Sequence, residues 1–338
     1  MDKRKKTYYK IKPLLSYLPT NTLSVLIKKG EVGRGNGINS IINLDNKKIF
    51  VKSIPLTQKE YDNSFDTKNL YNLPTYYNYG VGSAGINCWR ELIMHIKTTN
   101  WVLSGEIENF PLLYHYRIVK SNKKPTVSEW EKEELKDGIK YWGGNNNIGK
   151  YILDKEMAPY HIILCLEYIP VELETVLTIN MINSYIKNIN KILIFLGKKN
   201  IIHFDSHASN IVTNGKTIYL TDFGLTLDKT FNLSKTEINF FNKNKYYDYG
   251  LSYYQLVMPL LKTIQTNKIL EKKYKDPNDD YGYGLVFAKF ISDKERNMKN
   301  DKEIDNKYKN ILTKYKEIIV LYEKFRWTLE INNKKDTI

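Results

Sequence analysis

The pattern of hydrophobic and polar residues along this chain predicts both strands and helices. Short apolar runs that predict strands lie at residues 23–27, 49–51, 113–119 and 161–169. Stripes of apolar residues three and four positions apart predict helices over residues 87–100, 182–197, 249–262 and 308–322. Strand signals are therefore frequent before residue 170, and helix signals dominate after it.

An Asn-Gly pair at residues 214–215 separates two further short apolar runs. This dipeptide between β-prone segments predicts a hairpin, which would bring Asn210 close to Asp222 with Asp205 one loop away. Amide and carboxylate oxygens beside a carboxylate base suit metal-assisted phosphoryl transfer. Either segment alone is explained by ordinary turn residues, but the two in this order and spacing favour a functional site.

The sequences HFDSHASN at residues 203–210 and DFG at residues 222–224 resemble the catalytic core of the protein kinase superfamily, H-x-D-x-x-x-x-N followed by D-F-G. The resemblance implies that Asp205 is the base that orients an acceptor hydroxyl, and that Asn210 and Asp222 hold Mg²⁺ against the phosphates of ATP. It also implies an α+β, bilobal protein-kinase-like fold, in which an antiparallel β small lobe and a mainly helical large lobe enclose ATP.

A glycine-dense stretch, GEVGRGNG at residues 30–37, lies upstream at roughly the family spacing and follows the predicted strand 23–27. The resemblance implies that Gly33, Gly35 and Gly37 cover the nucleotide, and that Lys52 contacts its phosphates as a compact cation. A surface hairpin would explain the glycines alone about as well. Their order differs from G-x-G-x-x-G, so which of them cover the nucleotide stays open.

Glu91 matches the glutamate that pairs with the strand lysine in the family. The predicted helix around it carries an apolar stripe formed by Trp89, Leu92, Ile93 and Ile96. On a helical wheel Glu91 points away from this stripe. Either both faces of the helix are buried, or Glu91 is a solvated surface acid. No other nearby acid stands at a suitable position in the chain to pair with Lys52, which favours the ion pair.

The apolar segment HIILCLEYIP at residues 161–170 resembles the strand that leads into the hinge between kinase lobes. The resemblance implies that Leu166 backs an adenine pocket, and that the backbone of Glu167 and Ile169 hydrogen-bonds the adenine edge. A simple buried strand is compatible with this interpretation.

Three features depart from the family pattern. Phe204 stands where most regulated kinases carry an arginine that pairs with an activation-loop phosphate, which argues against that mode of control. His207 replaces the usual lysine, as in aminoglycoside and choline kinases; contact with the transferred phosphate and a loop histidine with a backbone partner are equally open roles. No Ala-Pro-Glu follows Asp222, and Asp248, which resembles the anchoring acid of the central large-lobe helix, comes only 26 residues after it.

The resemblance divides the chain into three parts. Residues 1–20 are a basic lead-in, residues 21–168 form the small lobe, and residues 169–338 form the large lobe. Two stretches, 57–85 and 121–158, are insertions in the small lobe. The second of these contains a charged helical stretch followed by a flexible Gly- and Asn-rich run.

Composition limits the class of protein. A chain of 338 residues with 42% hydrophobic and 13% aromatic residues is not mainly disordered. Its two cysteines have no metal-site or disulfide spacing, and no apolar run has the length of a membrane span, so we expect a soluble, intracellular protein. The net charge of +15 is compatible with an acidic protein or nucleic acid as partner. The lysines near the C-terminus, however, are better explained as the solvated face of an amphipathic helix. The sequence does not set the oligomeric state.

Three functions follow from the sequence. The leading hypothesis is an ATP- and Mg²⁺-dependent protein serine/threonine kinase. A kinase of the aminoglycoside or choline kinase type, acting on a small hydroxylated molecule, is the alternative that His207 and the short segment after Asp222 favour. A nucleotide-binding pseudokinase scaffold is disfavoured because Lys52, Asp205, Asn210 and Asp222 are all present.

Overall fold

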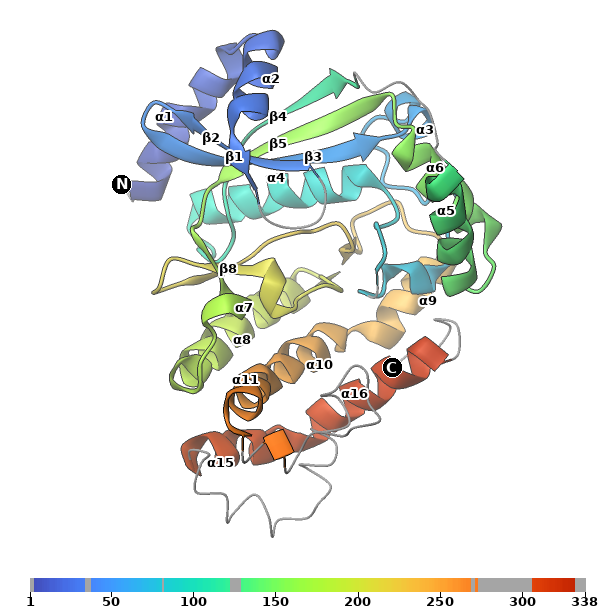
Figure 1. Cartoon of the computed structure of the whole chain (residues 1–338). Coiled ribbons are helices and arrows are strands. Elements are labelled where there is room, and N and C mark those ends of the chain that lie inside the picture. The colour runs from blue at the N-terminus through green and yellow to red at the C-terminus, as the bar shows by residue number, and fades with distance from the viewer. Residues whose placement is uncertain are drawn as a thin grey trace.

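The structure is a computed structural model that describes residues 3–33, 38–80, 82–121, 129–268, 271–272 and 306–331. It is a mixed α+β fold in which an antiparallel sheet occupies one half and helices dominate the other (Figure 1). The elements of the sheet half are α1 (Lys3–Tyr17), α2 (Thr20–Lys29), β1 (Glu31–Val32), β2 (Ile38–Leu44), β3 (Lys47–Leu56), α3 (Gln58–Asp62), the 3₁₀ helix η1 (Thr75–Asn78), α4 (Cys88–Ser104), β4 (Leu113–Lys120), α5 (Glu129–Tyr141), α6 (Asn146–Glu156) and β5 (Tyr160–Glu167).

The rest of the described chain is mainly helical. Its elements are β6 (Val171–Glu172), α7 (Leu173–Val176), η2 (Ile179–Met181), α8 (Ile182–Lys198), β7 (Ile201–Ile202), η3 (Ala208–Asn210), β8 (Ile211–Thr213), β9 (Ile218–Leu220), β10 (Leu227–Asp228), α9 (Lys235–Asn244), α10 (Tyr247–Tyr254), η4 (Gln255–Val257), α11 (Met258–Thr266), α15 (Asn306–Lys314) and α16 (Lys316–Ile331).

The five strands of the main sheet are ordered β1-β2-β3-β5-β4, and every neighbouring pair is antiparallel. Helix α4 packs along the face of the sheet that is turned toward the helical half (Figure 1). Its Trp89 and Leu92 join Ile162 and Leu164 of β5 in one buried apolar cluster. Lys52 lies in the middle strand β3, opposite Leu164 on one side and Asn39 on the other, so its backbone is held by both neighbours.

The strand predicted at residues 23–27 is wrong, because these residues belong to helix α2. Pro19 precedes the helix and Gly30 follows it, which are common helix boundaries. Lys28 and Lys29 lie in the last turn, where cations interact favourably with the helix dipole. Leu23 is buried, Leu26 and Ile27 pack against the same core, and Val25 is exposed, so the apolar run has helical rather than alternating spacing.

Residues 3–17, part of the basic lead-in for which the sequence predicted no structure, form helix α1. Helix α1 packs against β4 and places Tyr8, Ile11 and Leu15 in the main core. These residues recur at helical intervals among lysines, so burial of the apolar stripe stabilises a segment whose composition suggests a solvated charge run. The N-terminal segment is therefore an integral part of the fold.

The two expected insertions pack against each other at one end of the sheet (Figure 1). Tyr71 and Tyr77 from the first share a buried cluster with Trp142, Ile148 and Tyr151 from the second. The charged stretch expected to be helical forms α5. The run expected to be flexible is partly ordered, because the Asn145 side chain accepts hydrogen bonds from two backbone N–H groups and caps α6.

The helices predicted in the second half of the chain are confirmed with three refinements. The helix predicted over residues 249–262 consists of α10, the 3₁₀ helix η4 and α11 in succession. Helix α8 continues past Gly197 to Lys198. The apolar stripe at residues 308–322 is divided between α15 and α16, which pack with α10 into the helical half (Figure 1). Cys88 and Cys165 are both buried free thiols. Within the described ranges, no helix combines the length and apolar character that crossing a membrane requires.

Replacement of Ile11 by Ala is expected to lower the free energy of unfolding by about 2–5 kcal/mol, because it removes a fully buried side chain from the core. Urea unfolding followed by circular dichroism measures the change. Tyr17→Ala is the control, since Tyr17 ends the same helix with 83% of its surface exposed and its loss should cost no more than about 0.5 kcal/mol. Equal effects of the two substitutions would contradict the assignment of α1 to the core.

Candidate functional site

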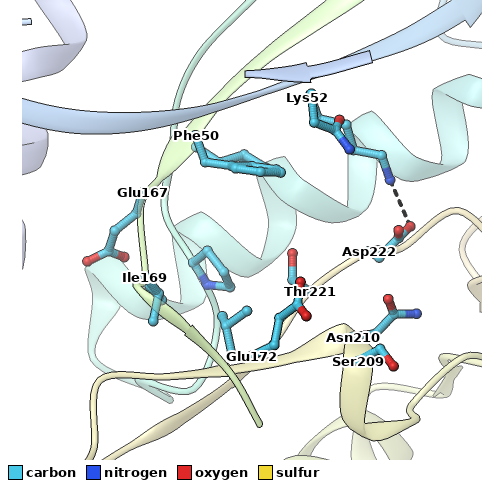
Figure 2. Close-up of a pocket in the computed structure, with 13 residues that line it drawn as sticks. Phe50, Lys52, Glu167, Ile169, Glu172, Ser209, Asn210, Thr221 and Asp222 are labelled. Atoms are coloured by element: carbon cyan, nitrogen blue, oxygen red, sulfur yellow. Dashed lines mark hydrogen bonds and ion pairs between the residues drawn. The ribbon is translucent and has the colours of Figure 1, made fainter. Parts of the chain in front are cut away.

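A cleft lies between the sheet half and the helical half, with about 650 Å³ of free space that is partly open to solvent. Figure 2 shows Phe50 and Lys52 of β3 on one side, and Asn210, Thr221 and Asp222 on the other. The cleft therefore collects side chains that are far apart in the sequence.

The predicted hairpin is confirmed and explains how Asn210 and Asp222 come together. Strands β8 and β9 are antiparallel, with Ile211 opposite Leu220. Gly215 in the connecting turn has φ of 89°, a conformation that favours glycine. The N–H of Thr221 donates to the Asn210 carbonyl at 3.0 Å, which extends the pairing to the residue before Asp222.

The loop at residues 203–210 is held from below by helix α10. The Asp248 carboxylate accepts hydrogen bonds from the backbone N–H of His203 at 2.6 Å and of Phe204 at 2.8 Å. Phe204 has φ of 63°, a strained value for an aromatic residue that persists only where the surroundings hold it. Burial raises the pKa of Asp248 to about 7, against the opposing effect of these two N–H donors.

His203 connects the loop at residues 203–210 to the residue that follows strand β9. Its Nε2 lies 3.1 Å from the Thr221 carbonyl and therefore donates, while its Nδ1 accepts from the N–H of Asp205 at 3.2 Å. Burial lowers the pKa of His203 to about 4, so the ring is neutral near pH 7. Its ring packs against Phe223, which also contacts His95 of α4, at centroid distances of 5.2 and 4.9 Å. This stack joins the two halves of the molecule behind the cleft.

Asp205, His207 and Asn210 form one polar cluster at the rim of the cleft. Asn210 Nδ2 donates to Asp205 Oδ2 at 2.7 Å, and His207 Nε2 lies 3.3 Å from Asp205 Oδ1. Burial disfavours the imidazolium of His207, but the nearby Asp205 carboxylate outweighs it and raises the pKa of His207. His207 thus has a side-chain carboxylate partner, whereas its contact with a phosphate stays a prediction.

Lys52 forms two ion pairs, at 2.6 Å with Glu91 and at 2.8 Å with Asp222 (Figure 2 shows the second). Both faces of α4 are buried, which resolves the two alternatives for Glu91 in favour of the ion pair. Burial disfavours each charge, but the opposite charges prevail: the pKa of Lys52 is raised, that of Glu91 is lowered, and that of Asp222 falls to about 2.

Leu166, Glu167 and Ile169 line the far end of the cleft. The N–H of Glu167 donates to the Leu112 carbonyl at 2.8 Å, so this N–H is engaged within the fold. The Glu167 carboxylate forms an ion pair with Arg4 of α1 at 2.7 Å. Sequence reasoning missed Arg4 because a Lys- and Arg-rich terminus usually is a solvated charge run.

The glycine-dense stretch connects the first two strands. Gly33 follows β1, and its N–H donates to the carbonyl of Asn39, a residue that lines the cleft. A Cβ atom at position 33 would lie 2.8 Å from Asn39 and Ser40 backbone atoms, so the two strands approach closely here. Gly35 and Gly37 lie outside the described residues.

The segment after Asp222 is fixed by contacts that the sequence did not reveal. Arg90, next to Glu91 in α4, forms a fully buried ion pair with Glu237 at 2.6 Å and donates to the Thr67 carbonyl at 2.8 Å. Thr67 Oγ1 in turn accepts from the N–H of Asn232 at 2.7 Å. The only sequence signal was the capping box Ser234-x-x-Glu237 at the start of α9.

The donor set at Asn210 and Asp222 fits Mg²⁺ carried by phosphate groups. Asn210 donates its amide N–H groups to the carbonyl and the carboxylate of Asp205, which leaves its Oδ1 as the acceptor. The Asp222 side chain keeps 39% of its surface exposed despite the ion pair with Lys52. Across the described ranges, no group of three or more His, Cys, Asp or Glu side chains is arranged to hold a metal. Mg²⁺ bound together with phosphate needs only one or two protein carboxylates.

The chain matches no model of a known protein family, and no curated protein sequence is significantly similar to it.

Lys52→Met is expected to reverse the pH dependence of stability below pH 7. In the wild type the lowered pKa values of Glu91 and Asp222 mean that the unfolded chain binds more protons, so stability is lost as pH falls below about 4. Without Lys52 the buried Glu91 carboxylate has no cation beside it, so its pKa rises, and the partly exposed Asp222 loses the cation that lowered its pKa. The folded variant then binds more protons, and its free energy of unfolding increases as pH falls from about 7 toward about 4.

Urea unfolding at a series of pH values measures this profile. Lys48→Met is the matched control, because Lys48 lies in the same strand but pairs with exposed Glu31. It should keep the wild-type profile. A Lys52→Met variant that also kept it would show that the two ion pairs do not set the charge states of Glu91 and Asp222.

Proposed function

We propose that this protein is an ATP-dependent phosphotransferase with a bilobal protein-kinase-like fold, most simply a divergent protein serine/threonine kinase. One observation carries the proposal: the Lys52–Glu91 and Lys52–Asp222 ion pairs and the Asp205–Asn210 hydrogen bond meet at one cleft, although the residues come from separate elements. On this interpretation, residues up to about 168 form the small lobe and those from about 169 form the large lobe.

The residues divide the work between positioning and proton transfer. Lys52 binds the phosphates of ATP, while Glu91 keeps the ammonium directed toward the cleft. Asn210 and Asp222 hold Mg²⁺, which neutralises charge on the phosphates when it is bound. Asp205 orients the acceptor hydroxyl. The hydroxyl oxygen forms a bond to the γ-phosphorus, the bond to the bridging oxygen of the ADP leaving group breaks, and Asp205 receives the hydroxyl proton.

Leu166 and Ile169 would contact the adenine, at the end of the cleft remote from Asp205. Gly33 would cover the phosphates together with Gly35 and Gly37. The Arg4–Glu167 ion pair supports this end of the cleft from outside, because Arg4 also donates to the carbonyls of Glu108 and Phe110. These contacts would fix the distance between the two lobes around the adenine.

The acceptor is a hydroxyl on a protein or on a small molecule. Serine or threonine of a protein, including an acidic one that complements the net charge of +15, is the leading acceptor. A specific observation favours the small-molecule alternative: residues of the first insertion lie directly against Asp205 and narrow the access to it. A pseudokinase scaffold, with a protein or nucleic acid as partner, is less well supported because the ion pairs and donors for nucleotide and Mg²⁺ are intact.

The site requires no phosphorylated residue to hold the segment after Asp222. Phe204, in place of the regulatory arginine, is buried among Tyr79, Phe240 and Tyr247. The buried Arg90–Glu237 pair supplies a permanent carboxylate where a switchable phosphate would otherwise be needed. We infer that the enzyme is active as synthesised.

Asp205→Asn is expected to reduce phosphate transfer by at least about 100-fold while leaving ATP affinity nearly unchanged, because it removes the base but not the phosphate contacts. Transfer is measured with γ-labelled ATP and Mg²⁺ against mixed basic and acidic proteins, and affinity by isothermal titration calorimetry. Asp45→Asn, in an exposed turn, is the matched control and should behave as the wild type. Transfer by Asp205→Asn at the wild-type rate would remove Asp205 from the mechanism.

Phosphatase-treated protein is expected to turn over as fast as untreated protein, because Glu237 already occupies Arg90. Mass spectrometry establishes the absence of phosphate before the rate is measured. Of the hydroxyl residues after Asp222, Thr226 is buried and the Ser234 side chain caps α9. Activity that appears only after phosphorylation of this segment would contradict the inference.

A further inference from the structure

An acceptor hydroxyl can approach only one of the two carboxylate oxygens of Asp205. Asp205 Oδ2 already accepts from Asn210 Nδ2 at 2.7 Å and belongs to the metal side of the cleft. Oδ1 has His207 Nε2 at 3.3 Å, and no other side chain of the described ranges pairs with it. If Asp205 receives a hydroxyl proton, as the proposed function requires, the hydroxyl must therefore approach Oδ1.

The backbone of Gly80 lies directly beside this oxygen. A Cβ atom at position 80 would be 2.5 Å from Asp205 Oδ1 and 3.0 Å from the Phe204 carbonyl oxygen, so no side chain fits there. Gly80 belongs to the first insertion, far in sequence from the loop that carries Asp205. The carboxylate nevertheless remains accessible, with 20% of its side-chain surface exposed.

Gly80 is held against Asp205 from both directions along the chain. Tyr79, which is fully buried, packs against Phe204, Phe240, Tyr247 and Phe325, and its hydroxyl donates to Asn244 Oδ1 at 3.1 Å. On the other side, Gly85 has φ of 81°, and a Cβ atom there would collide with the Gly224 carbonyl. We call residues 79–80 and 82–85 the strap; its two ends are anchored to the regions that carry Asp205 and Asp222.

The backbone of Gly80 thus lies close to Asp205 Oδ1, next to the fully buried Tyr79. A hydroxyl oxygen bonded to Oδ1 places its own carbon within contact distance of the strap. The hydroxyl-bearing carbon of a primary alcohol carries two hydrogen atoms, whereas that of a secondary alcohol carries a further methyl or larger group in place of one of them. Close-packed protein atoms do not yield space for an additional methyl group without cost.

We propose that Gly80 is a specificity-determining residue that makes the site prefer primary over secondary hydroxyl groups, which rests on the proposed phosphotransferase function. The preferred acceptor is then serine over threonine, or a primary over a secondary alcohol in a small molecule. The transfer itself is unchanged: the acceptor oxygen bonds to the γ-phosphorus, ADP leaves, and Asp205 takes the proton.

The first test compares acceptors on the wild-type protein, where folding is not in question. The probes are two peptide libraries with identical flanking positions and a central serine or threonine, and the pair ethanolamine and 1-amino-2-propanol, which differ by one methyl group. We expect the primary hydroxyl to be favoured by about tenfold or more in kcat/KM, the discrimination that one methyl group can provide. Equal rates within each pair overturn the proposal.

The second test compares Gly80→Ala with Gly82→Ala. The matched control lies in the same strap, has φ of 93° and has no atom within 4 Å of an added Cβ, so it strains the backbone without filling space at Asp205. Gly80→Ala should lower kcat for the primary hydroxyl by about tenfold or more. Because the added Cβ atom meets Asp205 Oδ1 itself, ATP hydrolysis should fall as well, whereas ATP affinity should match the wild type. Gly82→Ala should change all acceptors alike.

The outcomes separate this inference from the proposed function. Wild-type protein that neither binds nor hydrolyses ATP removes the proposed function and this inference with it. Wild-type protein that hydrolyses ATP but shows no preference, or labels neither member of a pair, leaves the phosphotransferase site standing and overturns the role of Gly80. Equal losses of transfer by Gly80→Ala and Gly82→Ala would also overturn it, because they would trace the loss to backbone strain in the strap and not to the space beside Asp205 Oδ1.

Discussion

The geometry of the candidate site depends on one buried carboxylate, Asp248. By accepting the N–H groups of His203 and Phe204, it holds Phe204 at a positive φ that an aromatic residue does not adopt freely. The sharp turn sends the Phe204 side chain into the core and Asp205 toward the cleft. Ser206 and Ala208 are tied to the same helical region through Ser252 and Gln255, so the whole loop rests on α10 and its continuation.

A second constraint connects this loop to the sheet. His203 fixes the carbonyl of Thr221 on one side and packs against Phe223, which packs against His95 of α4. The same helix carries Glu91, the partner of Lys52. Asp222, between Thr221 and Phe223, therefore has its backbone set by the aromatic stack and its charge set by Lys52. Charge and packing make the two halves of the molecule one unit at the cleft.

Residues 57–85 and 121–158, which the resemblance marked as insertions, are part of this packed unit. They share a buried aromatic cluster, and the first continues as the strap beside Asp205 before it enters α4. Thr67 and Arg90 then fix the segment after Asp222 through Asn232 and Glu237. Residues 57–85 thus reach the side of the cleft that carries Asp205 and Asp222.

The sequence by itself determined the local features: the hairpin between Asn210 and Asp222, the α4 and α8 helices, the mixed α+β character, and the residue types at the cleft. These follow from turn chemistry and from short-range periodicity, which act within a few residues. The sequence misassigned residues 23–27 and left the basic N-terminus without structure. Whether an apolar stripe of a helix is buried depends on which other elements pack against it, and local sequence does not show this. Only the tertiary structure decided that Glu91 is buried against Lys52, that Arg4 reaches Glu167, that Arg90 meets Glu237 and that Gly80 lies on Asp205. Each of these contacts joins residues more than 35 positions apart, and chain folding, not local sequence, sets such distances.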